Sequence, residues 1–164
     1  MKSEIERKFL LREQQATALK LYPGVTKKSL SQGYLAEGDH VILRVRIADD
    51  KAFITIKERS GGMARLELEV EIELEEGNKL LSLCSTTIEK TRYYVPYQGL
   101  IIELDEFLGN NSGLLMAEIE FTTEAEAEAF DAKELFEKEV TSDFRYYNSY
   151  LAEHPYTSWA ESDQ

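Results

Sequence analysis

The sequence is poor in the residues that build covalent cross-links and soft metal sites. It contains one cysteine, Cys84, and two histidines, His40 and His154. A single cysteine excludes an internal disulfide framework, and two scattered histidines cannot complete a zinc cluster with it. We therefore expect a core thiol at Cys84, a turn residue at His40 and a helix-end residue at His154, and we assign no chemistry to any of them.

Long apolar runs are also missing. No stretch approaches the roughly 18 apolar residues that a membrane-spanning helix needs, and the first residues lack the apolar core of a signal peptide. With the lone cysteine, these absences predict a reduced, cytoplasmic protein with no membrane partner. No linker or internal repeat divides the 164 residues, so we expect residues 1–164 to form a single domain.

Positive charge is scarce, since 19 Lys and Arg residues against 31 Asp and Glu residues give a net charge of −12. A nucleic-acid partner is disfavoured, because proteins that bind nucleic acid usually present a basic patch or stripe. A small polyanion is still compatible with this charge, because its binding depends on where the cations lie. The sequence does not decide the oligomeric state, and a homodimer is compatible with it.

What the sequence does have is alternation of apolar and charged residues, the pattern of half-buried strands. Many of the alternating segments are separated by Gly, Asn or Asp turn signals. They cover residues 2–10, 31–36, 40–48, 51–59, 64–74, 86–97, 99–108 and 114–121. Eight strands are enough to close a barrel, and the expected fold class is α+β, a closed eight-stranded antiparallel β-barrel with helices packed outside.

The gaps between these strands fit helices. Leucines at helical spacing predict helices over 12–21 and 75–85. Thr123 with Glu126 forms a capping box that predicts a helix near 124–131, and a last helix is expected over 143–153.

One face of nearly every strand is charged. Side chains two residues apart share a face, and in the first strand Glu4, Glu6 and Lys8 oppose Ile5 and Phe9. Two interpretations are open: the charged faces lie in water, as in many antiparallel sheets, or the barrel closes with the charges inside its lumen. We favour the lumen, because few uncharged polar residues share these faces. Since buried charges are costly unless paired, solvated or bound to metal, such a lumen indicates a site.

The charged positions fall into two sets. The carboxylates form pairs two residues apart: Glu4/Glu6, Glu67/Glu69 and Glu118/Glu120. Glu103 and Asp105 are also carboxylates two residues apart on one face of their strand. The cations are Lys8, Arg44, Arg46, Lys57, Arg65, Lys90 and Arg92. Mg²⁺ is held by a few carboxylates plus phosphate oxygens, and Arg and Lys side chains bind phosphates. The two sets of side chains together suit a polyphosphate, an anion that itself carries bound metal.

These motifs, in this order, resemble the triphosphate tunnel metalloenzymes, also called the CYTH superfamily. The resemblance spans nearly the whole chain. It rests on Glu4-Ile5-Glu6-Arg7-Lys8-Phe9-Leu10, Gln32-Gly33-Tyr34-Leu35, Leu43-Arg44-Val45-Arg46, Thr55-Ile56-Lys57, Arg65 with Glu67 and Glu69, Glu89-Lys90-Thr91-Arg92-Tyr93, Asp105-Glu106-Phe107, Ala117-Glu118-Ile119-Glu120, Lys138-Glu139-Val140-Thr141 and Arg145-Tyr146-Tyr147-Asn148. The chain departs from the family pattern at Ile101-Ile102, where an aromatic residue is expected.

The resemblance implies an eight-stranded tunnel, Mg²⁺ or Mn²⁺ as cofactor, and hydrolysis of a triphosphate. On this basis the metal ligands are Glu4, Glu6, Asp105, Glu118 and Glu120. Glu67 and Glu69 are further ligands or water orienters, and they join Glu4, Glu6 and Lys8 in the catalytic set. The phosphate-binding residues are Lys8, Arg44, Arg46, Lys57, Arg65, Lys90, Arg92 and Lys138.

Small members of the family with this ending favour inorganic tripolyphosphate, cleaved to diphosphate and phosphate by in-line attack of metal-activated water. The alternatives are a class IV-type adenylate cyclase, a thiamine or nucleoside triphosphatase, and a non-catalytic polyphosphate-binding module. If Glu118 and Glu120 lie beside Glu4 and Glu6, like-charge repulsion raises some carboxylate pKa values. Glu118→Gln should then leave the metal-free protein as stable or more stable.

Overall fold

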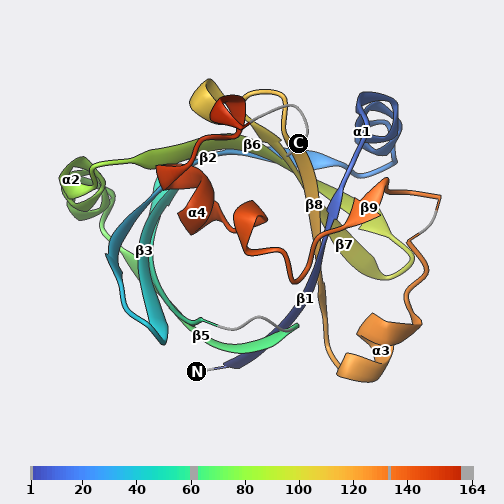
Figure 1. Cartoon of the computed structure of the whole chain (residues 1–164), viewed down its shortest axis with the longest axis horizontal. Coiled ribbons are helices and arrows are strands. Elements are labelled where there is room, and N and C mark those ends of the chain that lie inside the picture. The colour runs from blue at the N-terminus through green and yellow to red at the C-terminus, as the bar shows by residue number, and fades with distance from the viewer. Residues whose placement is uncertain (1, 60–62, 133, 160–164) are drawn as a thin grey trace.

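The structure is a computed structural model that describes residues 2–59, 63–132 and 134–159. Its main feature is a closed barrel of antiparallel strands (Figure 1): β1 (Lys2–Leu10), β2 (Thr26–Glu37), β3 (Val41–Ala48), β4 (Lys51–Glu58), β5 (Ala64–Ile72), β6 (Thr87–Tyr97), β7 (Leu100–Phe107) and β8 (Leu115–Phe121). The order around the barrel is β5-β4-β3-β2-β6-β7-β8-β1, and β1 pairs with β5 to close it. The predicted fold class and the eight predicted strands are confirmed.

Two strands differ from the prediction. β2 begins at Thr26, five residues before the predicted start at residue 31. The sequence shows no alternation there, because residues 26–29 are all exposed and carry no apolar face. These residues are held in the strand by pairing with β6. A short additional strand, β9 (Lys138–Glu139), pairs with the end of β1. A strand of two residues is too short to show the alternation of apolar and charged residues from which the other strands were predicted.

The helices in the described residues are α1 (Glu13–Lys20), α2 (Leu74–Leu83), α3 (Glu124–Ala129) and α4 (Asn148–Glu153), with short 3₁₀ turns η1 (Gly109–Asn111), η2 (Phe144–Tyr146) and η3 (Tyr156–Ser158). The predicted cap of α3 is present, since Thr123 Oγ1 accepts a hydrogen bond from the backbone N–H of Glu126 at 3.1 Å. The predicted helix over 143–153 is split into η2 and α4, because Tyr147 between them is extended. None of the described helices is long and apolar enough to cross a membrane.

Three helices pack outside the barrel and one lies across its opening (Figure 1). α1 packs near β6, α3 near β1 and β8, and α2 over β3 and β4. The approach of α2 requires glycine at position 77, where a Cβ atom would lie 2.4 Å from Ala52 Cβ. Cys84 is half-buried at the end of α2, His40 lies in the bend before β3, and His154 caps α4 as predicted.

The apolar core has two parts. One lies between the outer faces of the strands and the outer helices and includes Phe9, whose ring stacks on Phe136 with 4.5 Å between centroids. The other fills one end of the barrel interior, where Ile88, Phe107 and Met116 share the inward parity of their strands and pack with residues of the C-terminal segment. The barrel is therefore plugged by apolar side chains at one end and charged along the rest of its interior.

Candidate active site

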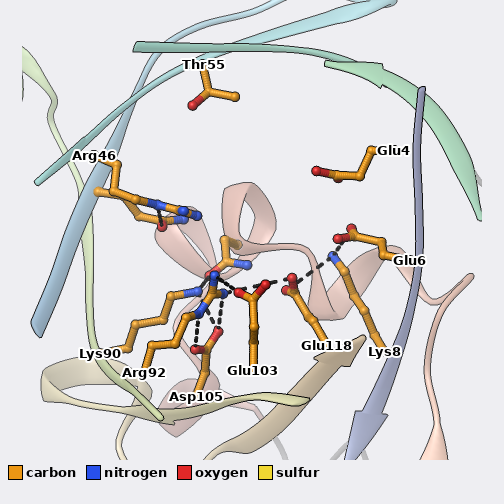
Figure 2. A network of polar contacts seen from close by, with 12 residues as sticks. Glu4, Glu6, Lys8, Arg46, Thr55, Lys90, Arg92, Glu103, Asp105 and Glu118 are labelled. Carbon is orange, nitrogen blue, oxygen red and sulfur yellow. Dashed lines mark hydrogen bonds and ion pairs between the residues drawn. The ribbon is translucent and has the colours of Figure 1, made fainter. Parts of the chain in front are cut away.

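The inward faces of the strands enclose a cavity of about 250 Å³. Twelve of the fifteen predicted site residues line it: Glu4, Glu6, Lys8, Arg44, Arg46, Lys57, Arg65, Glu67, Glu69, Arg92, Glu118 and Glu120. Figure 2 shows several of them pointing into the same space from different strands. The charged faces of these strands lie inside the barrel and not in bulk solvent, as the lumen interpretation predicts.

Cations alternate with the carboxylates of β1. Lys57 Nζ donates a hydrogen bond to Glu4 Oε1 at 3.0 Å, and Arg65 Nη2 donates to Glu6 Oε1 at 2.5 Å. Lys8 Nζ lies 3.8 Å from Glu6 Oε1. In the structure the carboxylates of β1 are therefore neutralised by cations of the chain itself.

On the opposite wall of the cavity, the buried carboxylate of Asp105 binds the guanidinium of Arg92. Asp105 Oδ1 accepts from Arg92 Nε at 2.7 Å, and Asp105 Oδ2 accepts from Arg92 Nη2 at 2.8 Å and from Lys90 Nζ at 2.7 Å. Arg92 Nη1 also donates to Glu103, and Lys90 Nζ donates to Asn148 Oδ1 at 3.0 Å (Figure 2). The guanidinium of Arg92 is thus fixed while it faces the cavity.

Three predicted site residues do not line the cavity. Asp105 was predicted to bind metal, but its side chain is fully buried and both of its oxygens are occupied by Arg92 and Lys90. Lys90 is likewise buried against Asp105, so its predicted contact with phosphate is not favoured. Lys138 lies on β9 outside the barrel and lines a separate groove with Arg12 and Tyr156. In this structure Asp105 and Lys90 lie behind Arg92, and Lys138 lies outside the cavity, so the binding roles expected of these three residues stay predictions.

The cavity also contains residues that the sequence prediction missed. Tyr94 lines it and shares the inward parity of β6, so strand parity could have identified it, and Glu103, which the sequence placed on the charged face without a role, lines it too. Tyr34 also lines it, next to the predicted arginines of β3. Residues 147–149 line it too, and no local pattern indicates that the chain returns to the barrel there.

The C-terminal segment reaches the cavity because it closes one end of the barrel. α4 lies across the barrel opening in Figure 1, and Leu151 packs in the same apolar cluster as Ile88, Phe107 and Met116. The ring of Tyr147 stacks against Lys8, with 4.7 Å from Nζ to the ring centroid. The tunnel is therefore blind at this end, and a ligand would enter from the other.

Burial and crowding shift the pKa values of several lining groups. Burial lowers the pKa of Lys8, and burial together with neighbouring arginines lowers the pKa of Arg46 to about 10. Burial alone would raise the pKa of Glu118, but Lys8 and Arg92 outweigh it and hold that pKa well below its ordinary value. For Glu103 burial outweighs Arg92, and the pKa is raised. The crowding of cations favours a bound anion, because one anion could pair with several of them.

Two buried polar atoms at the cavity make no hydrogen bond among the described residues: Arg44 Nε, a donor, and Glu67 Oε2, an acceptor that lies 3.4 Å from Lys57 Nζ in an ion pair. Buried polar groups are normally satisfied, so each such exception needs an explanation. Glu67 Oε2 already faces a cation of the chain, whereas Arg44 Nε is a donor that a bound anion would occupy.

The comparison with known proteins agrees with this geometry. Residues 2–147 match the family described as the CYTH domain. The chain belongs to the CYTH family. CYTH triphosphatases are metal-dependent in general.

Two CYTH relatives carry a function in their names. The chain is 40% identical to an inorganic triphosphatase of Acetivibrio thermocellus, over 98% of this chain and 100% of the relative. It is 38% identical to an inorganic triphosphatase of Nitrosomonas europaea, over 92% of this chain and 97% of the relative.

Solved structures share the fold. The crystal structure of the inorganic triphosphatase NE1496 superimposes with a TM-score of 0.64 at 35% identity, over 93% of this chain and 95% of that one. A protein of Pyrococcus horikoshii, PH1012, gives a TM-score of 0.61 at 21% identity over 76% of this chain and 83% of its own. At that identity the likeness shows the CYTH fold alone.

Proposed function

We propose that this chain is an inorganic triphosphatase that hydrolyses tripolyphosphate to diphosphate and phosphate. The observation that carries the proposal is the concentration of cations in one small cavity of a chain with a net charge of −12: Lys8, Arg44, Arg46, Lys57, Arg65 and Arg92. A phosphate chain would contact several of them at once, which is how Arg and Lys side chains bind phosphates. The names of the two CYTH relatives support the same activity.

The size of the cavity favours a bare phosphate chain over a nucleotide. Its volume of about 250 Å³ is below the roughly 300–1,000 Å³ of pockets that enclose drug-sized ligands. The apolar cluster around Leu151 closes one end, so an adenine or thiamine group would have to remain at the open end. Tripolyphosphate has no such group to accommodate.

We propose Mg²⁺ or Mn²⁺ as the cofactor. In the described part of the chain no three Asp, Glu, His or Cys side chains form a ready metal cluster. The donors nevertheless fit a hard cation that takes some of its ligands from substrate phosphates, because the carboxylates of several strands line one cavity. Glu4, Glu6, Glu118 and Glu120 would hold the ion, with Glu67 and Glu69 beside them. When bound, it would neutralise phosphate oxygens and lower the pKa of a water molecule.

The side chains of the protein would bind the substrate and balance its charge. Arg44 and Arg46 would contact phosphate oxygens from β3, and Arg92 from β6. Asp105 fixes Arg92 in advance, so the guanidinium need not reorganise as charge develops on the leaving diphosphate. Phosphate oxygens would also compete for Lys8, which lies between Glu6 and Glu118, and would free these carboxylates.

The bond that breaks is the phosphoanhydride bond to the terminal phosphorus. Water attacks that phosphorus in line with the leaving diphosphate, whose oxygen takes the electron pair of the broken bond. The described part of the cavity lining has no Cys or His side chain, so Ser149, which lines the cavity, has no neighbouring imidazole to activate its hydroxyl. We therefore propose direct attack by water and no covalent intermediate on the protein.

A substrate panel tests the proposal. Purified protein is incubated with tripolyphosphate, ATP or thiamine triphosphate, with Mg²⁺, with Mn²⁺ or with EDTA, and phosphate and cyclic AMP are measured. We expect tripolyphosphate to be consumed fastest, with no turnover in EDTA. Arg46→Ala should slow the reaction, whereas Lys138→Ala, which removes a cation outside the tunnel, should not. Cyclic AMP as the main product would support a cyclase, and metal-dependent binding without turnover would support a binding module.

A further inference from the structure

The outer face of β3, β4 and β5 is aliphatic and largely exposed. Its most exposed side chains are Val41 at 45%, Ile56 at 38%, Leu66 at 46%, Leu68 at 37% and Val70 at 50%. Strand pairing joins them into one surface, because Ile56 pairs with both Leu43 and Leu68, and Ile54 pairs with Val70. We call this surface the β3–β5 face, and it consists of Val41, Leu43, Ile54, Ile56, Leu66, Leu68 and Val70.

No described helix covers the β3–β5 face. α1 packs on β6 and α3 packs on β1 and β8, and in Figure 1 no helix lies on the outside of β5. α2 covers only the far end of β3 and β4, where Gly77 meets Ala52 and Ile47. The exposed aliphatic face is therefore the part of the barrel wall that lacks a partner.

The charges around this face favour a second copy of the same chain. With a net charge of −12, two copies repel each other over most of their surfaces. None of the seven residues of the β3–β5 face is ionisable, and the carboxylate of Glu58, at the end of β4, lies at its edge beside Val41 and Leu66. The two ends of the face carry compensated pairs, Lys51 with Glu71 at 3.8 Å and Arg59 with Glu37 at 2.8 Å. An uncharged centre with a polar rim is the anatomy of a protein interface.

We propose that the β3–β5 face is the contact surface of a homodimer, in which two copies pack these faces together about a two-fold axis. A two-fold contact uses the same patch on both subunits, and two sheets pack face to face about 10 Å apart. A standard interface buries about 800 Å² per partner, more than the roughly 300–600 Å² apolar patch of a typical monomer. The seven aliphatic residues would form the centre of such an interface, and the paired charges would form its rim.

The dimer would support the pairing of β1 with β5, which closes the barrel through few residue pairs. β1 and β5 close the barrel through four residue pairs, whereas β3 and β4 share eight. β5 supplies Arg65, Glu67 and Glu69 to the cavity, and its outer face carries Leu66, Leu68 and Val70. A second copy packed on the outside of β5 would hold this strand in place, whichever triphosphate the tunnel accepts.

The test is the mass of the full chain in solution, measured by light scattering and by sedimentation over a range of concentrations. We expect twice the 18.8 kDa of one chain. Leu68→Lys combined with Val70→Lys should give monomers, because it places two like charges at the centre of the interface. The control is Leu21→Lys, which adds one such charge away from the β3–β5 face, at a leucine that follows α1 and is 80% exposed, and should remain a dimer.

The milder variant Leu68→Ala keeps the test valid if the double lysine variant does not fold. It should weaken the dimer about tenfold or more in Kd, a change of about 1.4 kcal/mol for each factor of ten, with an unchanged circular dichroism spectrum. A wild-type protein that is monomeric at every concentration overturns the proposal. So does a dimer that resists both substitutions. Sedimentation of a monomeric wild type with phosphatidylcholine vesicles would assign the face to a lipid surface, and would also overturn it.

Discussion

Glu118 and Glu103 lie opposite each other on β8 and β7, and the structure predicts different outcomes when each is neutralised. Glu118 Oε1 lies 4.0 Å from Lys8 Nζ, and Glu118 Oε2 lies 3.9 Å from Arg92 Nη2. The side chain is 13% exposed. Glu118→Gln keeps the size of the side chain but removes the negative charge that balances these two cations.

The magnitude follows from burial and distance. A unit charge pair at 4 Å is worth about 4 kcal/mol at an effective dielectric constant of 20, and removing one partner of a buried pair costs about 3–5 kcal/mol. Because both distances are long for ion pairs, we expect Glu118→Gln to lower the free energy of unfolding of the metal-free protein by about 2–3 kcal/mol, at or just below the lower limit of that range. For a protein of this size this corresponds to a Tm lower by about 4–12 °C.

The pH dependence has a definite sign. The pKa of Glu118 is lowered in the folded state, so its ionised form stabilises the protein above the unfolded pKa of about 4.3. This stabilisation is lost as the pH falls through the folded value. The Tm difference between wild type and Glu118→Gln should be full at neutral pH and should narrow below about pH 4.

Glu103→Gln is the matched control, because the pKa of Glu103 is raised in the folded state. Its ionisation therefore opposes folding at neutral pH, and the variant should melt at the same temperature as wild type or higher. The assay is calorimetry of the three proteins in EDTA across the acid and neutral range. A Glu118→Gln variant as stable as wild type at neutral pH, or a Glu103→Gln variant that loses as much, would refute this electrostatic account.

Three further predictions concern the tunnel walls. Arg44→Ala combined with Arg46→Ala should raise KM more than it lowers kcat and should weaken inhibition by diphosphate, because both groups would contact bound phosphate throughout the reaction; unchanged steady-state kinetics would contradict this. Asp105→Asn should cost about 3–5 kcal/mol in denaturant unfolding, since it removes the ion-pair partner of the buried Lys90 and leaves Arg92 with Glu103 and Glu118 alone, while the metal concentration for half-maximal activity stays constant; a large rise in that concentration would restore Asp105 as a ligand. Leu151→Ala should cost about 2–5 kcal/mol through the cavity it creates and should raise the turnover of ATP relative to tripolyphosphate; an unchanged ratio would mean that the plug does not select the substrate.

Strand parity predicted most of the tunnel because it is a local property. A period of two decides which residues share a face, and twelve predicted residues do line one cavity. Parity does not decide how deep a side chain lies along the tunnel. Asp105 and Lys90 share a face with Glu103 and Arg92, but they lie closer to the plug, where Asn148 covers Lys90.

The register between strands was the second quantity that the sequence could not supply. The expectation that Glu118→Gln would stabilise the metal-free protein assumed carboxylates side by side. In the structure Lys8 pairs directly with Glu118 across β1 and β8, and Glu6 pairs with Glu120. A cation therefore stands next to Glu118, and the expected repulsion becomes attraction. Contacts across the whole chain, such as Tyr147 on Lys8, have no local signal.

The central claim is that the tunnel hydrolyses tripolyphosphate with the help of a divalent metal. The most direct measurement is a ³¹P NMR time course of tripolyphosphate with the protein, first in EDTA and then after addition of excess Mg²⁺ or Mn²⁺. We predict no change in EDTA, followed after the metal is added by the appearance of diphosphate and phosphate in equal amounts. Cleavage that proceeds equally well in EDTA, or tripolyphosphate that stays intact with either metal, would contradict the account.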